Sequence, residues 1–148
     1  MSRYATVMQT LDDAVLAHCE GRLSDAERGY HRVISADPRH PDAWHLLGVV
    51  AHERGDHSIA EERIRRALTF GASDAVVWNN LGLALAAQKR AEEAVRAYLR
   101  AIDADPEFAE AHLNLAIALS AQGRWEEAAD VYGRAGELHG AFSDEIVR

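Results

Sequence analysis

The sequence repeats itself with a period of 34 positions, and this period constrains the fold more than any other feature. The segment 44–48 (WHLLG) realigns with the segment 78–82 (WNNLG) at that offset. A fixed period of this length is typical of arrays in which each repeat is one supersecondary unit that stacks on the next. Extending the offset in both directions predicts four repeats, which span residues 7–40, 41–74, 75–108 and 109–142.

Small and bulky residues recur at fixed places within each repeat. Because small residues allow two helices to approach closely, we expect two helices of each repeat to cross at the small columns and the bulky column to fill the space beside them. The small columns are Ala26, Ala60, Ala94 and Ala128, and Gly48, Gly82 and Ala116; the bulky column is Tyr30, Ile64, Tyr98 and Tyr132.

The apolar spacing within a repeat predicts two α-helices separated by a turn. Trp78, Leu81 and Leu85 follow one another at intervals of three and four residues, which is the helical period. A glycine column near the middle of the repeat permits the left-handed conformation that ends a helix. It consists of Gly21, Gly55 and Gly123, with Lys89 in the third repeat. We therefore expect an all-α fold.

Local signals also predict where the second helices begin and where each repeat ends. The segments 24–27 (SDAE) and 58–61 (SIAE) have the pattern of capping boxes, with Ser24 and Ser58 as N-caps. Pro38 and Pro106 stand at repeat ends, where proline cannot continue a helix. The second helices place acidic residues before basic ones, which we interpret as a solvent-exposed outer face.

Composition excludes several classes of function. Sixteen basic residues are mixed with twenty-four acidic ones, and the net charge of −8 argues against a nucleic-acid or anionic-membrane partner. A single cysteine, Cys19, excludes an internal disulfide framework and fits a reducing compartment. No stretch approaches the ~20 apolar residues of a membrane helix, and no signal-peptide core is present, so we expect a cytoplasmic protein.

The repeat resembles the tetratricopeptide repeat (TPR) family, whose consensus runs Trp, two residues, Leu-Gly, two residues, Tyr, then Ala, three residues, Phe, then Pro. The third repeat matches this pattern best, with Trp78, Leu81, Gly82, Leu85, Ala94, Tyr98, Ala101 and Pro106. The fourth has His112 in place of Trp, and the first has Thr10 and Asp13 in place of Trp and Leu. The four repeats together cover positions 7–142 of the chain.

The resemblance implies a single domain over residues 1–148, built as a right-handed α-solenoid of four TPR hairpins. It also implies that the first helices line a concave groove in which a protein or an extended peptide segment lies. On this basis the candidate peptide-binding residues are Asp12, His45, Leu46, Val49, His52, Asn79, Asn80, Leu83, Asn114 and Ile117.

Two of these residues, Asn80 and Asn114, occupy equivalent places. An asparagine can donate to and accept from one peptide unit, so a ladder of them can hold an extended backbone without reading its sequence. The TPR segments of O-linked N-acetylglucosamine transferases look similar at this column. Asp12 and Leu46 stand at the other two places, so the ladder has two rungs here. Alternatively, these asparagines are simply polar residues on an exposed helix face.

Other chemistries find little support in the sequence. None of the groove positions is Lys or Arg, which TPR domains that clamp a C-terminal carboxylate use. His18 with Cys19 and His52 with Glu53 stand at matching places in adjacent repeats and could meet as zinc ligands, but solvent-facing groove residues are the simpler interpretation. No phosphate loop or nucleophile motif is present. We predict no catalytic residue, no metal and no cofactor.

The C-terminal residues of the sequence suggest alternatives to a simple binding scaffold. Ser143 has the pattern of an N-cap, so residues 143–148 are predicted to start a truncated capping helix. Met1 is consistent with a true N-terminus, and either the natural chain continues or this end pairs with another copy. We therefore expect a non-catalytic binding scaffold. The alternatives are an N-terminal recruiting segment of a larger enzyme, such as a glycosyltransferase or methyltransferase, and a homo-oligomer formed through the uncapped last repeat.

Overall fold

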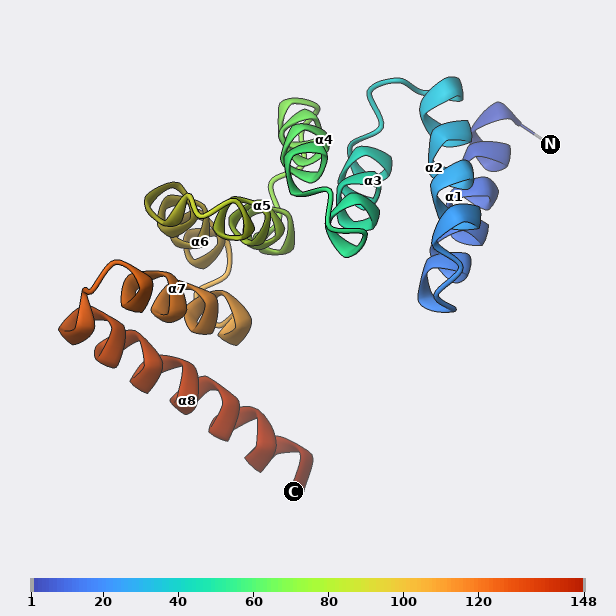
Figure 1. Cartoon of the computed structure of the whole chain (residues 1–148). Coiled ribbons are helices and arrows are strands. Elements are labelled where there is room, and N and C mark those ends of the chain that lie inside the picture. The colour runs from blue at the N-terminus through green and yellow to red at the C-terminus, as the bar shows by residue number, and fades with distance from the viewer. Residues whose placement is uncertain (1, 148) are drawn as a thin grey trace. The chain divides into compact units, whose positions relative to one another are not determined.

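The computed structural model describes the backbone of residues 2–147 and the side chains of residues 2–140. Within this range the backbone forms eight α-helices and no strand (Figure 1). The helices are α1 (Arg3–Cys19), α2 (Leu23–Ala36), α3 (Pro41–Glu53), α4 (His57–Thr69), α5 (Ala75–Ala87), α6 (Ala91–Ala104), α7 (Ala109–Ala121) and α8 (Trp125–Val147). The all-α prediction is confirmed.

The chain divides into two compact units, Met1–Ala72 with α1–α4 and Ser73–Arg148 with α5–α8. In the first unit α1 packs along α2 and α3 along α4, and α2 also contacts α3. In the second unit α5 packs along α6 and α7 along α8, while α7 contacts both α5 and α6. Each unit is thus a pair of stacked helical hairpins, which is the arrangement of an α-solenoid. A single domain with a right-handed twist stays a prediction.

The two helices of a hairpin cross at the small residues that the sequence places there. Ala26, Ala60, Ala94 and Ala128 are at most 2% exposed. At Gly48, an added Cβ would lie 2.5 Å from Ile64 Cγ1, and at Gly82 it would overlap the Tyr98 ring. Of the bulky column, Tyr30, Ile64 and Tyr98 are buried, whereas Tyr132 in the last hairpin is 42% exposed. Close helix crossing therefore depends on alanine at the first set of positions and on the missing side chain at Gly48 and Gly82.

The turn between the two helices adopts a left-handed conformation in every hairpin. The φ angles of Gly21, Gly55 and Gly123 are +76°, +85° and +72°. Lys89 occupies the same place in the third hairpin with φ of 60°, and no other non-glycine residue of the described chain has a positive φ. A non-glycine residue in this conformation costs roughly 1–2 kcal/mol. The packing of α5 on α6 holds the turn in place despite this cost.

The second helices do not begin with capping boxes, so that prediction is wrong. α2 starts at Leu23 and α4 at His57, one residue before Ser24 and Ser58 respectively, and neither helix has a side-chain cap. The Ser24 hydroxyl instead accepts a hydrogen bond from Arg54 at 3.1 Å. In three hairpins an arginine directly precedes the second helix and pairs with an acidic residue three positions later. The acidic side chain lies in the first turn, where its negative charge interacts favourably with the positive end of the helix dipole. The pairs are Arg22–Asp25, Arg90–Glu93 and Arg124–Glu127.

In the second and fourth repeats, the first residue of the repeat consensus closes the turn that precedes the first helix. Trp44 donates from Nε1 to the Pro38 carbonyl at 2.8 Å, six residues earlier. His112, which replaces tryptophan in the fourth repeat, makes the equivalent contact from Nε2 to the Pro106 carbonyl, also at 2.8 Å. A carbonyl oxygen only accepts, so Nε2 of His112 carries the hydrogen. The substitution therefore preserves the hydrogen bond.

The last helix is longer than predicted. α8 runs from Trp125 to Val147 without interruption, so residues 143–147 continue it rather than starting a separate capping helix. The side chain of Ser143, the predicted N-cap, lies outside the described side chains. Capping by a serine requires a non-helical backbone at that residue, and the helix of α8 passes through position 143.

Two glycine-to-alanine substitutions test how much the close crossing matters. Gly82→Ala should lower the free energy of unfolding by about 1–2 kcal/mol, because overlap with the Tyr98 ring outweighs the gain in helix propensity. Gly133→Ala, whose added Cβ meets nothing within 4 Å, should raise it by roughly 0.5–1 kcal/mol. Urea denaturation followed by circular dichroism measures both, and equal effects at the two sites would contradict the crossing argument.

Candidate functional site

The candidate binding residues of the first unit lie on the first helices of its hairpins. Asp12 is exposed on α1. His45, Leu46, Val49 and His52 lie on α3 and are half-buried. His45, Val49 and His52 follow at intervals of four and three residues and share one side of α3, and Leu46 lies next to them, three residues before Val49. The first unit therefore presents a mixed apolar and imidazole surface along α3.

In the second unit, the candidates form two columns on α5 and α7. Asn80 and Leu83 are half-buried on α5, and their equivalents in the next repeat are Asn114, half-buried, and Ile117, 51% exposed, on α7. The two helices contact each other directly. Each thus carries an amide and, one turn later, an apolar side chain at the same place. The role of these residues in peptide binding stays a prediction.

Asn79 does not lie on this accessible surface, and its assignment as a binding residue is corrected. Its side chain is 1% exposed. Its Nδ2 donates to Glu110 Oε1 at 3.4 Å, and its Oδ1 accepts from Asn114 Nδ2 at 3.0 Å. Asn79 therefore faces the next hairpin, where it satisfies its polar groups and holds the Asn114 amide in one orientation.

A second polar network links the two hairpins of the first unit. His18 on α1 lies 3.0 Å from the Tyr30 hydroxyl through Nδ1 and 2.9 Å from Glu53 Oε2 through Nε2. When the ring is neutral, Nε2 donates to the carboxylate and Nδ1 accepts from the hydroxyl. Burial, together with nearby Cys19 and Glu53, raises the pKa of Tyr30 to about 12. The tyrosine thus stays neutral and serves as a hydrogen-bond donor.

A histidine pair closes the turn between α3 and α4. The Nδ1 atoms of His52 and His57 lie 3.1 Å apart, and the two ring centroids are separated by 4.8 Å. Burial lowers the pKa of His52, and the positive charge of a protonated His57 lowers it further, while Glu53 acts in the opposite direction. One neutral ring can donate to the other, whereas two charged rings would repel each other.

The described residues contain no group of three or more His, Cys, Asp or Glu side chains arranged to hold a metal ion. Of the residues considered as zinc ligands, His18 and Glu53 do lie together, but they share a hydrogen bond in a network that also involves Tyr30. Cys19 is exposed and free. The arrangement is that of a structural link between α1, α2 and α3.

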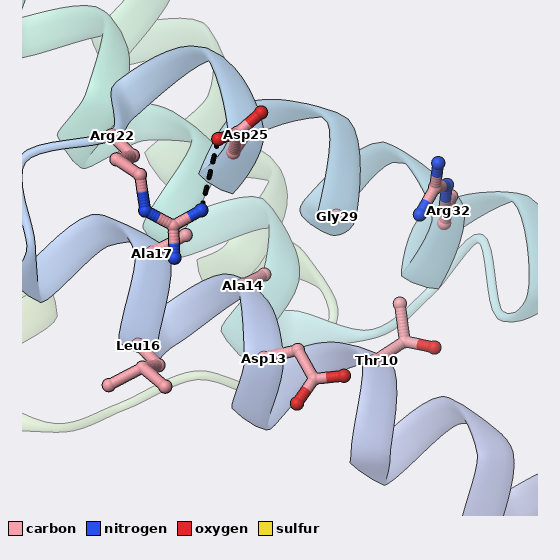
Figure 2. A pocket seen from close by; sticks show the side chains of 9 residues that line it. All are labelled: Thr10, Asp13, Ala14, Leu16, Ala17, Arg22, Asp25, Gly29 and Arg32. Atoms are coloured by element: carbon pink, nitrogen blue, oxygen red, sulfur yellow. Dashed lines mark hydrogen bonds and ion pairs between the residues drawn. The ribbon is translucent and has the colours of Figure 1, made fainter.

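The exposed face of the first hairpin carries a polar pocket of about 360 Å³ between α1 and α2 (Figure 2). Asp13 and Arg32 lie at its rim, and Arg22 pairs with Asp25 at 3.0 Å. The neighbouring Arg22 and Arg28 lower the pKa of Asp25 through hydrogen bonds. Charges of both signs on an open surface suit solvation rather than selective binding.

Sequence reasoning missed a stacking role for two arginines that it assigned to the solvent-exposed face. The guanidinium carbon of Arg66 lies 4.6 Å from the Trp44 ring centroid, and that of Arg100 lies 4.8 Å from the Trp78 ring. A cation over an indole face within ~6 Å is stabilising. The signal was available, because in both repeats the arginine follows the tryptophan at the same interval.

Profiles of the tetratricopeptide repeat match the sequence over residues 20–75 and 111–142, and a TPR repeat profile matches residues 82–123. The chain belongs to the tetratricopeptide repeat family. Among the described helices of this TPR protein, none is both long enough and apolar enough to cross a membrane. No curated protein sequence matches the chain.

Solved structures share the fold of this TPR protein. A crystal structure of MamA aligns with a TM-score of 0.85 and 21% identity, covering 93% of this chain and 81% of that one. YrrB, described as a TPR protein with an unusual peptide-binding site, aligns with a TM-score of 0.80 and 18% identity over 97% of this chain and 78% of its own.

A third structure is more similar in sequence but much longer. A mutant O-GlcNAc transferase from Thermobaculum terrenum aligns with a TM-score of 0.77 and 30% identity. The alignment covers 80% of this chain and 23% of the transferase. This agrees with the resemblance to the TPR segments of such transferases that the sequence suggests.

The depressed pKa of His52 predicts that acid destabilises the first unit. Because the folded pKa lies below the unfolded value of about 6.5, the unfolded state binds the proton more readily, so stability is lost as the pH falls through this range. His52→Gln should reduce the loss in free energy of unfolding between pH 7.5 and 5.5, as measured by urea titration at both values.

His57→Gln is the matched variant for this experiment. It removes the neighbouring charge but not the burial, which is the larger cause of the shift. Its effect should therefore have the same direction as that of His52→Gln and a smaller size. A loss of stability in His52→Gln as large as in the parent protein would show that His52 does not govern the acid response.

Proposed function

We propose that this TPR protein binds an extended segment of another protein along its first helices and carries out no chemistry. The observation that carries the proposal is the pair of columns in the second unit. Asn114 is held in one orientation by the buried Asn79, and Ile117 one turn later leaves half of its surface exposed. A fixed amide next to an exposed apolar side chain suits a peptide unit and its neighbouring side chain.

The repeat geometry sets the register of such a ligand. Neighbouring packed helices lie about 8–10 Å apart, and an extended chain rises roughly 3.3 Å per residue. Asn80 on α5 and Asn114 on α7 would therefore meet peptide units about three residues apart. The apolar side chains of Leu83 and Ile117 would follow the same interval and contact every third side chain of the ligand.

The side chains also indicate the chemistry of the partner. The candidate positions contain no Lys or Arg, so a clamp on a C-terminal carboxylate is not favoured. Half-buried Leu46 and Val49 give an apolar surface on α3, and Asp12 supplies an exposed negative charge on α1. We expect an apolar or mildly basic segment. A free, exposed Cys19 is consistent with the cytoplasm as its location.

Peptides selected from a displayed random 12-residue library provide the ligand for a test. Ile117→Ser and Asn114→Ala should each raise the Kd of a selected peptide about tenfold, because each removes one contact. Leu99→Ser is the matched control, because Leu99 is 46% exposed but lies on the second helix α6. Fluorescence anisotropy measures the Kd, and circular dichroism checks that every variant is folded. Equal effects of Ile117→Ser and Leu99→Ser would contradict the proposal.

A second candidate function is a recruiting segment of a larger enzyme. The similarity to an O-GlcNAc transferase at 30% identity favours this candidate. The aligned part is 23% of the transferase, so a chain of this kind can be one segment of a much longer enzyme. On this proposal the same face would present a substrate to a catalytic domain. Sequencing the transcript beyond the Arg148 codon decides the question, because a stop codon directly after it would remove this candidate.

A further inference from the structure

The fourth hairpin carries an apolar groove between α7 and α8, which adjoins the peptide-binding face proposed above and differs from it in including α8. The groove has a volume of about 550 Å³ and includes Leu113, Tyr132, Ala135 and Gly136 among its lining residues. Leu113 is 44% exposed and Tyr132 is 42% exposed. Glu110 and His139 also line it, and Glu110 is the acidic residue among its lining residues.

In the preceding hairpin, the equivalent surface is covered by a helix. The residues that stand at the places of Leu113, Tyr132 and Ala135 one repeat earlier are Asn79, Tyr98 and Ala101. These are 1%, 2% and 0% exposed, respectively. They lie on α5 and α6, which α7 contacts. In the fourth hairpin the groove is therefore equivalent to the surface by which the third hairpin receives α7, the first helix of the next repeat.

The covering helix α7 shows which side chains such a surface accepts. Ala111 packs with Ala75 and Ala101, and Phe108 packs against the same cluster. Glu110 and Asn114 hydrogen-bond with Asn79. The contact thus combines a small residue, an aromatic residue one turn before it, and polar residues only where Asn79 faces them.

We propose that the groove binds an amphipathic α-helix of another protein, in the way that α7 covers the preceding hairpin. Two exchanges define its chemistry. In the third hairpin Asn79 donates a hydrogen bond to Glu110 of the covering helix α7. Because Leu113 stands in place of Asn79 in the fourth hairpin, the docked helix should carry an apolar residue where α7 carries Glu110. Gly136 replaces Ile102, and its absent side chain leaves room for a large aromatic or aliphatic residue next to the place of Phe108.

The first helix of a second copy of this chain fits the groove poorly. Gln9 and Asp13 of α1 stand at the places of Ala111 and Leu115 of α7. Both are exposed, and docking would bury the Asp13 carboxylate against Tyr132 and Leu113. Asp13 accepts a hydrogen bond from Gln9 Nε2 at 2.9 Å, and docking would remove the water that solvates the rest of this charged carboxylate, which is unfavourable. Because α1 presents Gln9 and Asp13 where α7 presents apolar residues, we favour a helix from a different protein over a head-to-tail chain of copies.

A peptide derived from α7 tests the proposal. The probe is residues 105–121 of this chain with Glu110→Leu and a tail of three lysines for solubility. Without a covalent link to supply effective concentration, we expect a Kd of about 10–100 μM for the 148-residue chain. Tyr132→Lys should raise this Kd at least tenfold. Trp125→Lys should change it less than twofold, because Trp125 is exposed on the same helix and does not line the groove.

Exchanging the residue at position 113 of the protein together with the residue at position 110 of the peptide tests whether these two side chains meet in the complex. Leu113→Asn recreates the residue of the preceding hairpin, so this variant should prefer the peptide with the native Glu110, whereas the parent protein prefers the leucine peptide. A double-mutant cycle over the two proteins and two peptides measures the coupling, which should amount to at least a fivefold change in relative affinity. Independent effects would overturn the proposed orientation.

Two other outcomes would overturn the proposal as a whole. One is the absence of peptide binding up to about 1 mM, the affinity scale of non-specific contact. The other is dimerisation of the protein alone at about 100 μM in analytical ultracentrifugation that Tyr132→Lys abolishes, which would assign the groove to a second copy. Neither result depends on the peptide face of α5 and α7, so failure here leaves the proposed function intact.

Discussion

The structure depends on the close crossing of two helices within each hairpin. At each crossing an alanine that is almost fully buried lies near a glycine or alanine, and in the first three hairpins a buried bulky side chain fills the space beside them. A single hairpin buries one apolar side and leaves another exposed, so hairpins must stack to complete the core. Repetition of this crossing in every repeat produces both the fold and the set of equivalent first helices from which any binding face must be built.

Polar contacts then join successive hairpins, and they differ between the two units. In the first unit His18 connects Tyr30 with Glu53, and in the second Asn79 connects Glu110 with Asn114. Apolar packing alone tolerates small shifts between hairpins, whereas hydrogen bonds fix one arrangement. In the second unit this link also orients Asn114, so a residue buried between hairpins prepares the side chain that we propose to meet the ligand.

Much of the local structure could be predicted because it depends on residues close together in the chain. The helix pairs and the left-handed glycine turns follow from spacing and from backbone sterics. The starts of the second helices were predicted less well. Ser24 lies inside α2, which begins at Leu23, and Arg22 directly before the helix pairs with Asp25 in a contact that the capping pattern does not describe. Arg66 and Arg100 were assigned to solvent, yet each stacks on the tryptophan of its own repeat.

The sequence by itself determined that this chain consists of stacked helical hairpins of the tetratricopeptide type, because a period of 34 positions with small residues at fixed places permits few other solutions. Only the tertiary structure decided which polar residues are accessible. Asn79 and Asn80 are neighbours with identical side chains, but a helix turns by about 100° per residue, so one is buried against α7 and the other is half-exposed. Likewise, Tyr98 and Tyr132 are equivalent in sequence and differ in exposure, because a following hairpin covers the first and no described helix covers the second.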